Sequence, residues 1–170
     1  FLPKNSEYET ERYRLSSCYR PANVCGGDWW WYRENNGILK LILGDVTGHG
    51  IGPAMVTSSM ATIVKTLERF SRDSLEEIIS IVNSELYDLA NGDFLVSMNA
   101  LEINMNNKKM TNWHTGAPTI ALIGNNKLES LHYRSKFIGY TKDSNFKNSV
   151  IDLKGTDRII VYSDALYEQV

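Results

Sequence analysis

The segment that decides the fold is ILKLILGDVTGHGIGP, which occupies residues 38–53. It begins with a nearly continuous apolar run, Ile38–Leu43, and such a run is typical of a strand buried on both faces. The glycines of residues 44–52 are expected to break that strand. Pro53 suits the start of a helix, because its missing N–H would have no partner there. The segment therefore predicts a buried strand, a glycine-rich loop and a helix over residues 54–70.

The residues before this segment predict further extended structure. Tyr13–Tyr19 places Leu15 among polar neighbours, as a partly exposed strand does, and Trp29–Arg33 is aromatic and extended. Asn36-Gly37 separates the aromatic stretch from the apolar run, and both residues tolerate the positive φ of a tight turn. We therefore expect a β-hairpin around Asn36-Gly37.

A second helix is expected to begin near Asp73 or Ser74 and to end at Asn91-Gly92. Ser74 and Glu77 have the spacing of a capping box, and the glycine can take the left-handed conformation that closes a helix. Apolar residues recur at helical spacing and form one stripe. That stripe consists of Leu75, Ile78, Ile79, Val82, Leu86 and Leu89.

Beyond this helix the pattern is that of strands and turns. The expected strands are Phe94–Ile103, Met110–His114, Thr119–Ile123 and Arg158–Tyr162, whereas residues 135–149 carry a weak polar pattern typical of a loop. Strands, then two helices, then more strands indicate an α+β fold in which helices pack on mostly antiparallel sheet.

The composition is that of one ordinary globular domain. The chain has 170 residues, 42% of them apolar and 22% charged, with a net charge of -2. Such a balance argues against binding to nucleic acid or to an anionic membrane surface. No apolar run is long enough to cross a bilayer. The two cysteines, Cys18 and Cys25, form neither a CxxC motif nor a disulfide framework, so we expect a reducing, cytoplasmic location.

Three aspartates lie beside glycines or at the end of an extended stretch. Asp28 follows two glycines, Asp45 follows the buried strand, and Asp164 follows Arg158–Tyr162. Carboxylates gathered at a sheet edge suit a hard cation such as Mg²⁺ or Mn²⁺, and a pair of such ions can clamp a phosphate and activate water. An aspartate at a strand end can equally be a plain turn residue, and spacing alone leaves both interpretations open.

The histidine nearest to these acids is His49. An imidazole can donate a proton to a leaving oxygen near neutral pH, but His49 can also merely hydrogen-bond its own loop, and the sequence does not separate the two. His114 and His132 have no acidic or cysteine partners nearby in sequence, which indicates core or surface roles.

A competing interpretation treats residues 44–52 as a phosphate-binding loop before a helix, since helix N-termini bind anions. The glycines match neither G-x-G-x-x-G nor a P-loop with its lysine. Asp45 would also repel phosphate unless a metal ion lay between them. The residues therefore favour a metal site over a bare nucleotide loop.

Three motifs occur in order along the chain. They are PANVCGGDW at residues 21–29, GDVTGHG at residues 44–50 and YSD at residues 162–164. Together they resemble the SpoIIE/RsbU-type bacterial serine/threonine phosphatases of the metal-dependent (PPM) protein phosphatase superfamily. The resemblance implies a sandwich of two antiparallel β-sheets flanked by α-helices, with a two-metal Mn²⁺ or Mg²⁺ site at one edge.

The resemblance also implies a role for each residue of that site. Asp45 would bridge the two metal ions, and the carbonyl of Val46 would be a further ligand. Asp28 would serve one ion and Asp164 the other. Asp45 and His49 are therefore the expected catalytic residues.

The same resemblance implies the biological setting. Family members remove phosphate from serine or threonine of STAS-type anti-sigma-factor antagonists. Leu2-Pro3 resembles the end of the linker that joins this domain to an upstream sensor domain, so residues 1–170 are expected to be one phosphatase domain of a longer chain. A homodimer formed through that linker is a further expectation. Helices 54–70 and 73–90 occupy the place of the family's regulatory switch elements.

The chain departs from the family pattern at several positions. Cys25 replaces a common valine, Thr115-Gly116-Ala117-Pro118 replaces Ala-Gly-His-Pro, and Ala165 replaces a glycine after Asp164. The family usually continues to a final strand with an Asp-Asp pair, so the fold is expected to be C-terminally incomplete at Val170. These departures keep a second hypothesis open, a catalytically weak or inactive module with the phosphatase fold that binds a partner protein.

Overall fold

The computed structural model describes residues 7–20, 26–117, 120–143 and 145–166. The expectations for Leu2-Pro3, Cys25, Pro118-Thr119, Val170 and the Ala165 side chain lie outside the described residues. The strands are β1 (Glu7–Glu9), β2 (Arg14–Ser16), β3 (Asp28–Asn35), β4 (Ile38–Val46), β5 (Val96–Asn104), β6 (Lys109–Thr115), β7 (Ile120–Gly124), β8 (Lys127–Leu131), β9 (Asn148–Asp152) and β10 (Arg158–Ile160). The helices are α1 (Ile51–Arg69), α2 (Leu75–Ala90) and the short 3₁₀ turn η1 (Asp164–Leu166).

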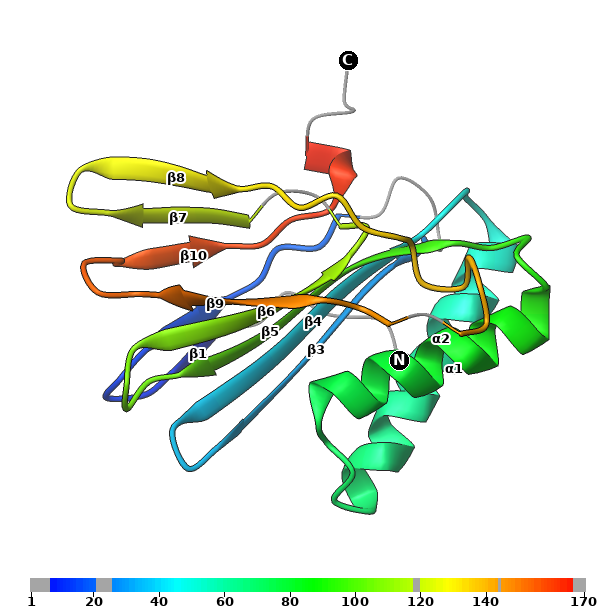
Figure 1. Cartoon of the computed structure of the whole chain (residues 1–170), viewed down its shortest axis with the longest axis horizontal. Coiled ribbons are helices and arrows are strands. Elements are labelled where there is room, and N and C mark those ends of the chain that lie inside the picture. Colours follow the sequence, from blue (N-terminus) through cyan, green and yellow to red (C-terminus); the bar gives the residue numbers. More distant parts are fainter. Residues whose placement is uncertain (1–6, 21–25, 118–119, 144, 167–170) are drawn as a thin grey trace.

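The described strands form two stacked antiparallel sheets, as expected. One has five strands in the order β3-β4-β5-β6-β9, the other has three in the order β10-β7-β8, and β1 and β2 form a separate ribbon. Helices α1 and α2 cover the face of the five-stranded sheet that points away from the three-stranded sheet (Figure 1). The predicted α+β sandwich is therefore confirmed.

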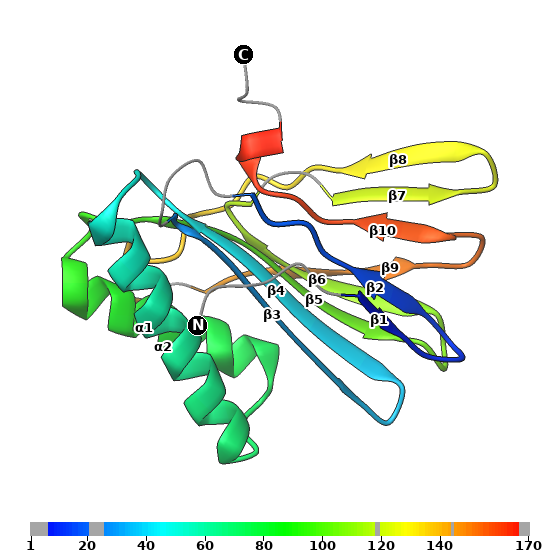
Figure 2. The same cartoon turned by 180° about the vertical axis from the view of Figure 1, so that it is seen from behind.

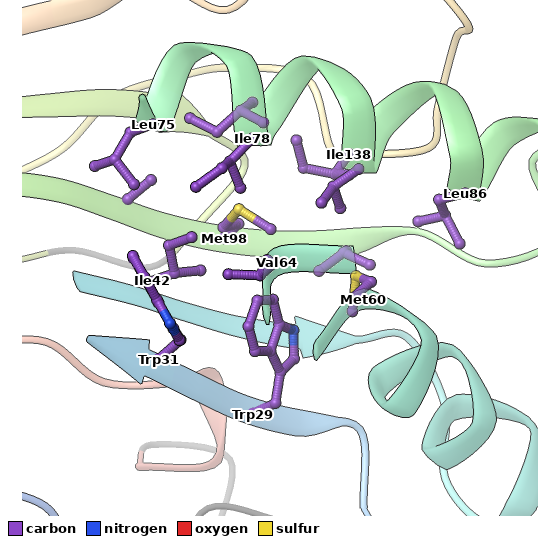
Figure 3. Close-up of a cluster of buried hydrophobic side chains, with 14 of the residues drawn as sticks. Trp29, Trp31, Ile42, Met60, Val64, Leu75, Ile78, Leu86, Met98 and Ile138 are labelled. Atoms are coloured by element: carbon purple, nitrogen blue, oxygen red, sulfur yellow. The ribbon is translucent and has the colours of Figure 1, made fainter. Parts of the chain in front are cut away.

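Two apolar cores hold these layers together. The larger lies between the helices and the five-stranded sheet, where Met60 and Val64 of α1 meet Trp29 and Ile42 of the sheet (Figure 3). The smaller lies between the two sheets and is built around Leu101, Met110, Ile120, Leu122 and Leu153. Because successive side chains of a strand point to opposite faces, β4 serves both cores, and none of its residues is exposed.

The predicted hairpin at Asn36-Gly37 is confirmed, with φ angles of 52° and 78° at the two turn residues. The predicted break of the strand at Gly44 is wrong. Strand β4 continues through Gly44 to Val46, because Gly44 pairs with Trp29 in the ladder and leaves room for its indole. A Cβ at residue 44 would lie 2.6 Å from Trp29 Nε1, so this glycine serves close packing rather than a bend.

Both predicted helices are confirmed with altered ends. Ser74 is the N-cap of α2, but it makes no side-chain cap hydrogen bond, and Glu77 accepts instead from Arg72 Nε at 2.8 Å. Asn91, not Gly92, is the left-handed C-cap. Leu89 does not belong to the buried stripe and is 66% exposed, because α2 meets the sheet along a narrower face than the pattern suggested.

Three described strands were not predicted, and more than one predicted strand is shorter in the structure. Strand β10, for example, ends at Ile160 rather than at Tyr162. The strand expected over Tyr13–Tyr19 is reduced to β2, which pairs with the unpredicted β1. Strand β8 pairs only with β7, and β9 begins inside the segment expected to be a loop. All three are polar and mostly exposed, so they lack the apolar alternation by which a strand is recognised.

Candidate metal centre

The hairpin ladder places two of the predicted site residues opposite each other. Asp28, the first residue of β3, pairs with Asp45 near the end of β4. Directly opposed side chains of antiparallel strands have Cβ atoms about 4.5–5.5 Å apart. Two carboxylates at this separation repel each other unless a proton or a cation lies between them.

The third predicted aspartate approaches from the other sheet. Asp164 is the first residue of η1, which follows β10, and all three aspartates are half-buried. Burial raises the pKa of the Asp28 carboxyl above its ordinary value of 3.8, a hydrogen bond from Ser163 lowers it, and the charge of Asp164 raises it. Asp164 is therefore close enough for its charge to act on Asp28, and the net shift is upward.

Gly27 and Val46 complete the arrangement around Asp28. The N–H of Val46 donates to the carbonyl oxygen of Gly27 at 3.2 Å. A Cβ at residue 27 would lie 2.6 Å from the carbonyl oxygen of Val46, the atom that the resemblance assigns as a metal ligand. Only glycine therefore fits at residue 27 without displacing that carbonyl.

The loop between β4 and α1 is held at its start and carries His49. The N–H of Thr47 donates to the Leu95 carbonyl at 2.8 Å, and the Thr47 hydroxyl accepts from the Leu95 N–H at 3.1 Å. Gly48 and Gly50 have φ angles of 92° and 94°, which favour glycine. His49 lies exposed between them, so its role as a proton donor stays a prediction.

An apolar groove of about 440 Å³ opens beside Asp28. Its lining includes Asp28 and Ser163 at one end and Trp30, Leu41 and Leu43 of the five-stranded sheet. Residues of β2 and β10, and residues that follow each strand, line its sides. Both strands are labelled in Figure 2. Asp28 is therefore one of the residues that line this groove.

The described side chains fit a hard divalent cation. Oδ1 of Asp28 is buried without a hydrogen-bond partner in the described part of the chain, and the negative charge of Asp164 acts on the same carboxyl. Among the described residues no group of three or more His, Cys, Asp or Glu is arranged to hold one ion. A site with one or two carboxylates and a backbone carbonyl is nevertheless sufficient for Mg²⁺, which keeps several of its own waters.

The raised pKa of Asp28 predicts how stability depends on pH in the metal-free protein. An acid whose pKa is higher in the folded state stabilises the fold below its unfolded pKa, and this contribution is lost as pH rises through the folded pKa. We expect the wild type to lose stability relative to Asp28→Asn from about pH 4 upward. Urea unfolding of both proteins across this range measures the difference, and parallel pH profiles would contradict the interpretation.

Sequence reasoning missed two polar residues at this centre, Ser163 and Thr57. Ser163 was noted only as part of a motif, although it hydrogen-bonds Asp28. Thr57 of α1 donates to the carbonyl of Gly27 at 2.9 Å. Its signal in the sequence is a hydroxyl residue next to Val56 on the apolar face of a helix, where burial without a partner would be costly.

Comparison with known proteins identifies the family of the chain. Residues 35–170 match the family described as "Stage II sporulation protein E (SpoIIE)". No curated protein matches the sequence. In the described residues, no helix combines the length and apolar character needed to span a membrane.

Solved structures share the fold at low sequence identity. RsbX in complex with magnesium has a TM-score of 0.74 at 14% identity, over 98% of this chain and 81% of that one. The RsbU and RsbW domains of a Mycobacterium tuberculosis protein give 0.70 at 20% identity, over 88% and 42%. The SiaA-PP2C domain of Pseudomonas aeruginosa gives 0.65 at 18% identity, over 79% and 54%. The chain thus belongs to the SpoIIE family and has the fold of bacterial PP2C-type serine phosphatases.

Proposed function

We propose that this chain is a metal-dependent phosphatase that removes phosphate from serine or threonine of a protein substrate. The observation that carries the proposal is the pairing of Asp28 with Asp45 across the β3–β4 ladder, with Asp164 beside them. Family membership and the magnesium complex of RsbX support Mg²⁺ or Mn²⁺ as the cofactor. Asp28, Asp45, Asp164 and the Val46 carbonyl would hold it.

A bound divalent cation would neutralise phosphate charge and lower the pKa of a water molecule. Residues of the chain position this cation and supply a proton. The carboxylates of Asp28 and Asp45 fix the position of the positive charge, and Gly27 keeps the Val46 carbonyl unobstructed. In the hydrolysis, water oxygen bonds to phosphorus while the bond to the serine oxygen breaks. His49 is the proposed donor of the proton that the serine oxygen takes up.

The sharpest test is release of inorganic phosphate from phosphoserine proteins and peptides. With Mn²⁺ or Mg²⁺ in excess we expect turnover, and with EDTA we expect none, with recovery when the metal is restored. A STAS-type anti-sigma-factor antagonist is the proposed substrate, so its phosphorylated form should react faster than an unrelated phosphopeptide. Equal turnover with EDTA and with metal would contradict the proposal.

We propose a bacterial signalling setting for this activity. The chain spans 42% of the Mycobacterium tuberculosis chain that contains RsbU and RsbW domains, which supports an output domain within a longer protein. In that setting it would act in the cytoplasm on a regulator of a sigma factor, under an upstream sensor domain. A homodimer is the proposed assembly.

A second candidate is a module that binds a partner without turnover. It is favoured by the finding that no described group of three or more His, Cys, Asp or Glu is arranged around one ion. Calorimetric titration with Mn²⁺ discriminates the two functions. Binding at micromolar concentrations favours the phosphatase, whereas a folded chain that takes up no Mn²⁺ at millimolar concentrations favours the module.

A further inference from the structure

Helix α1 carries a buried hydroxyl that reaches the carboxylate centre. The buried residues of α1 are Pro53, Val56, Thr57, Met60, Val64 and Leu67, and Thr57 is the polar one among them. Met60 and Val64 on this face point into the core toward the sheet (Figure 3). If residue 57 served packing alone, a larger apolar side chain would suffice. Packing therefore does not explain its hydroxyl.

The partner of that hydroxyl is the peptide that carries Asp28. Thr57 is 2% exposed, and its Oγ1 donates to the carbonyl oxygen of Gly27 at 2.9 Å. The same oxygen accepts the N–H of Val46 at the longer distance of 3.2 Å. Gly27 O therefore joins three elements, the strand that begins with Asp28, the end of β4 and helix α1.

The neighbouring groups show why the position of this peptide matters. Residue 27 lies so close to Val46 that an added Cβ would be 2.6 Å from the Val46 carbonyl oxygen. A rotation of the Gly27 peptide would move the backbone of Asp28 and disturb the hydrogen bond that the Val46 N–H donates to the Gly27 carbonyl. Groups that orient metal ligands through hydrogen bonds, without binding the metal themselves, commonly affect metal affinity about 10–100-fold.

We propose that Thr57 is a positioning residue for the centre formed by Asp28, Asp45 and Val46. It acts through the Gly27 carbonyl and makes no contact with substrate. This inference rests on the proposed function, because it concerns the affinity of that centre for a divalent cation. The resemblance places residue 57 in a helix at the position of a switch element, but it assigns no role to the residue itself.

The test compares Mn²⁺ affinity of the wild type with that of three variants by isothermal titration calorimetry of the metal alone. Thr57→Val keeps the branched shape and removes the hydroxyl, and we expect binding weakened about 10- to 100-fold. Thr57→Ser restores a hydroxyl and should bind nearly as the wild type does. Thr62→Val is the matched control, since the Thr62 hydroxyl donates to the Ser58 carbonyl on the exposed face of α1.

The possible outcomes distinguish a failure of the role of Thr57 from a failure of the proposed phosphatase function. Wild-type binding with an unchanged affinity in Thr57→Val would overturn the role of Thr57 and leave the phosphatase proposal standing. Absence of Mn²⁺ binding in a folded wild type would overturn both. If Thr57→Val fails to fold by circular dichroism, Thr57→Ala removes the same hydroxyl without adding bulk, and the same loss of affinity is expected.

Discussion

Substitution of Asp45 by asparagine is expected to lower Mn²⁺-dependent phosphatase activity by roughly 100-fold or more. Asp45 pairs with Asp28 across the ladder, and the resemblance gives it the bridging position, so the change removes the negative charge on which the proposed centre depends most. Initial rates of phosphate release at saturating Mn²⁺ measure the loss. Because asparagine keeps the shape of aspartate, the fold should remain intact.

The loss of activity should be specific to residues of the proposed centre. Asp143→Asn is the matched control, since this exposed aspartate lies outside the centre. Full activity in Asp45→Asn, or an equal loss in the control, would contradict the assignment.

Substitution of Gly27 by alanine is expected to damage both the fold and the centre. The new Cβ would lie 2.6 Å from the backbone oxygen of Val46 and 3.2 Å from its Cβ, so the backbone must shift. Overpacking of this kind typically costs about 1–3 kcal/mol, which corresponds to roughly 2–4 °C in Tm for each kcal/mol in a protein of this size. Mn²⁺ affinity should fall as well, because the shift displaces Val46 and Asp28.

Gly92→Ala is the control that separates the loss of stability from the loss of Mn²⁺ affinity. Gly92 has a φ of 89°, so alanine is strained there, but an added Cβ would meet nothing within 4 Å. We expect thermal unfolding to show a loss of stability in both variants, and calorimetry to show weakened Mn²⁺ binding in Gly27→Ala alone. Equal Mn²⁺ affinity in the two variants would show that residue 27 matters only for stability.

The pairing of Asp28 with Asp45 could be predicted from the sequence. The Asn36-Gly37 turn sets Asn35 opposite Ile38, and equal steps outward from this pair bring Asp28 opposite Asp45. The expected break of the strand at Gly44 prevented the prediction of this pairing, because it placed Asp45 in a loop and not in the strand. A glycine in a strand can mark the close approach of a neighbouring side chain, and here that side chain is the indole of Trp29.

The remaining parts of the centre depend on tertiary structure that no local pattern reveals. Asp164 reaches Asp28 because β10 pairs with β7 in the second sheet, so its position depends on how the two sheets stack. Thr57 meets Gly27 only because α1 packs on the five-stranded sheet. Short polar strands such as β8 and β9 escaped prediction for a related reason, since their partners rather than their own residues stabilise them.

The aspartates at adjacent ends of β3 and β4 are proposed to form a divalent-metal centre, and anomalous diffraction from crystals grown with MnCl₂ tests this proposal most directly. We predict an anomalous difference peak about 2.0–2.3 Å from a carboxylate oxygen of Asp45, with Asp28 and the Val46 carbonyl around the same site. No peak near Asp28 and Asp45 at millimolar Mn²⁺, or peaks confined to surface carboxylates elsewhere, would contradict the account.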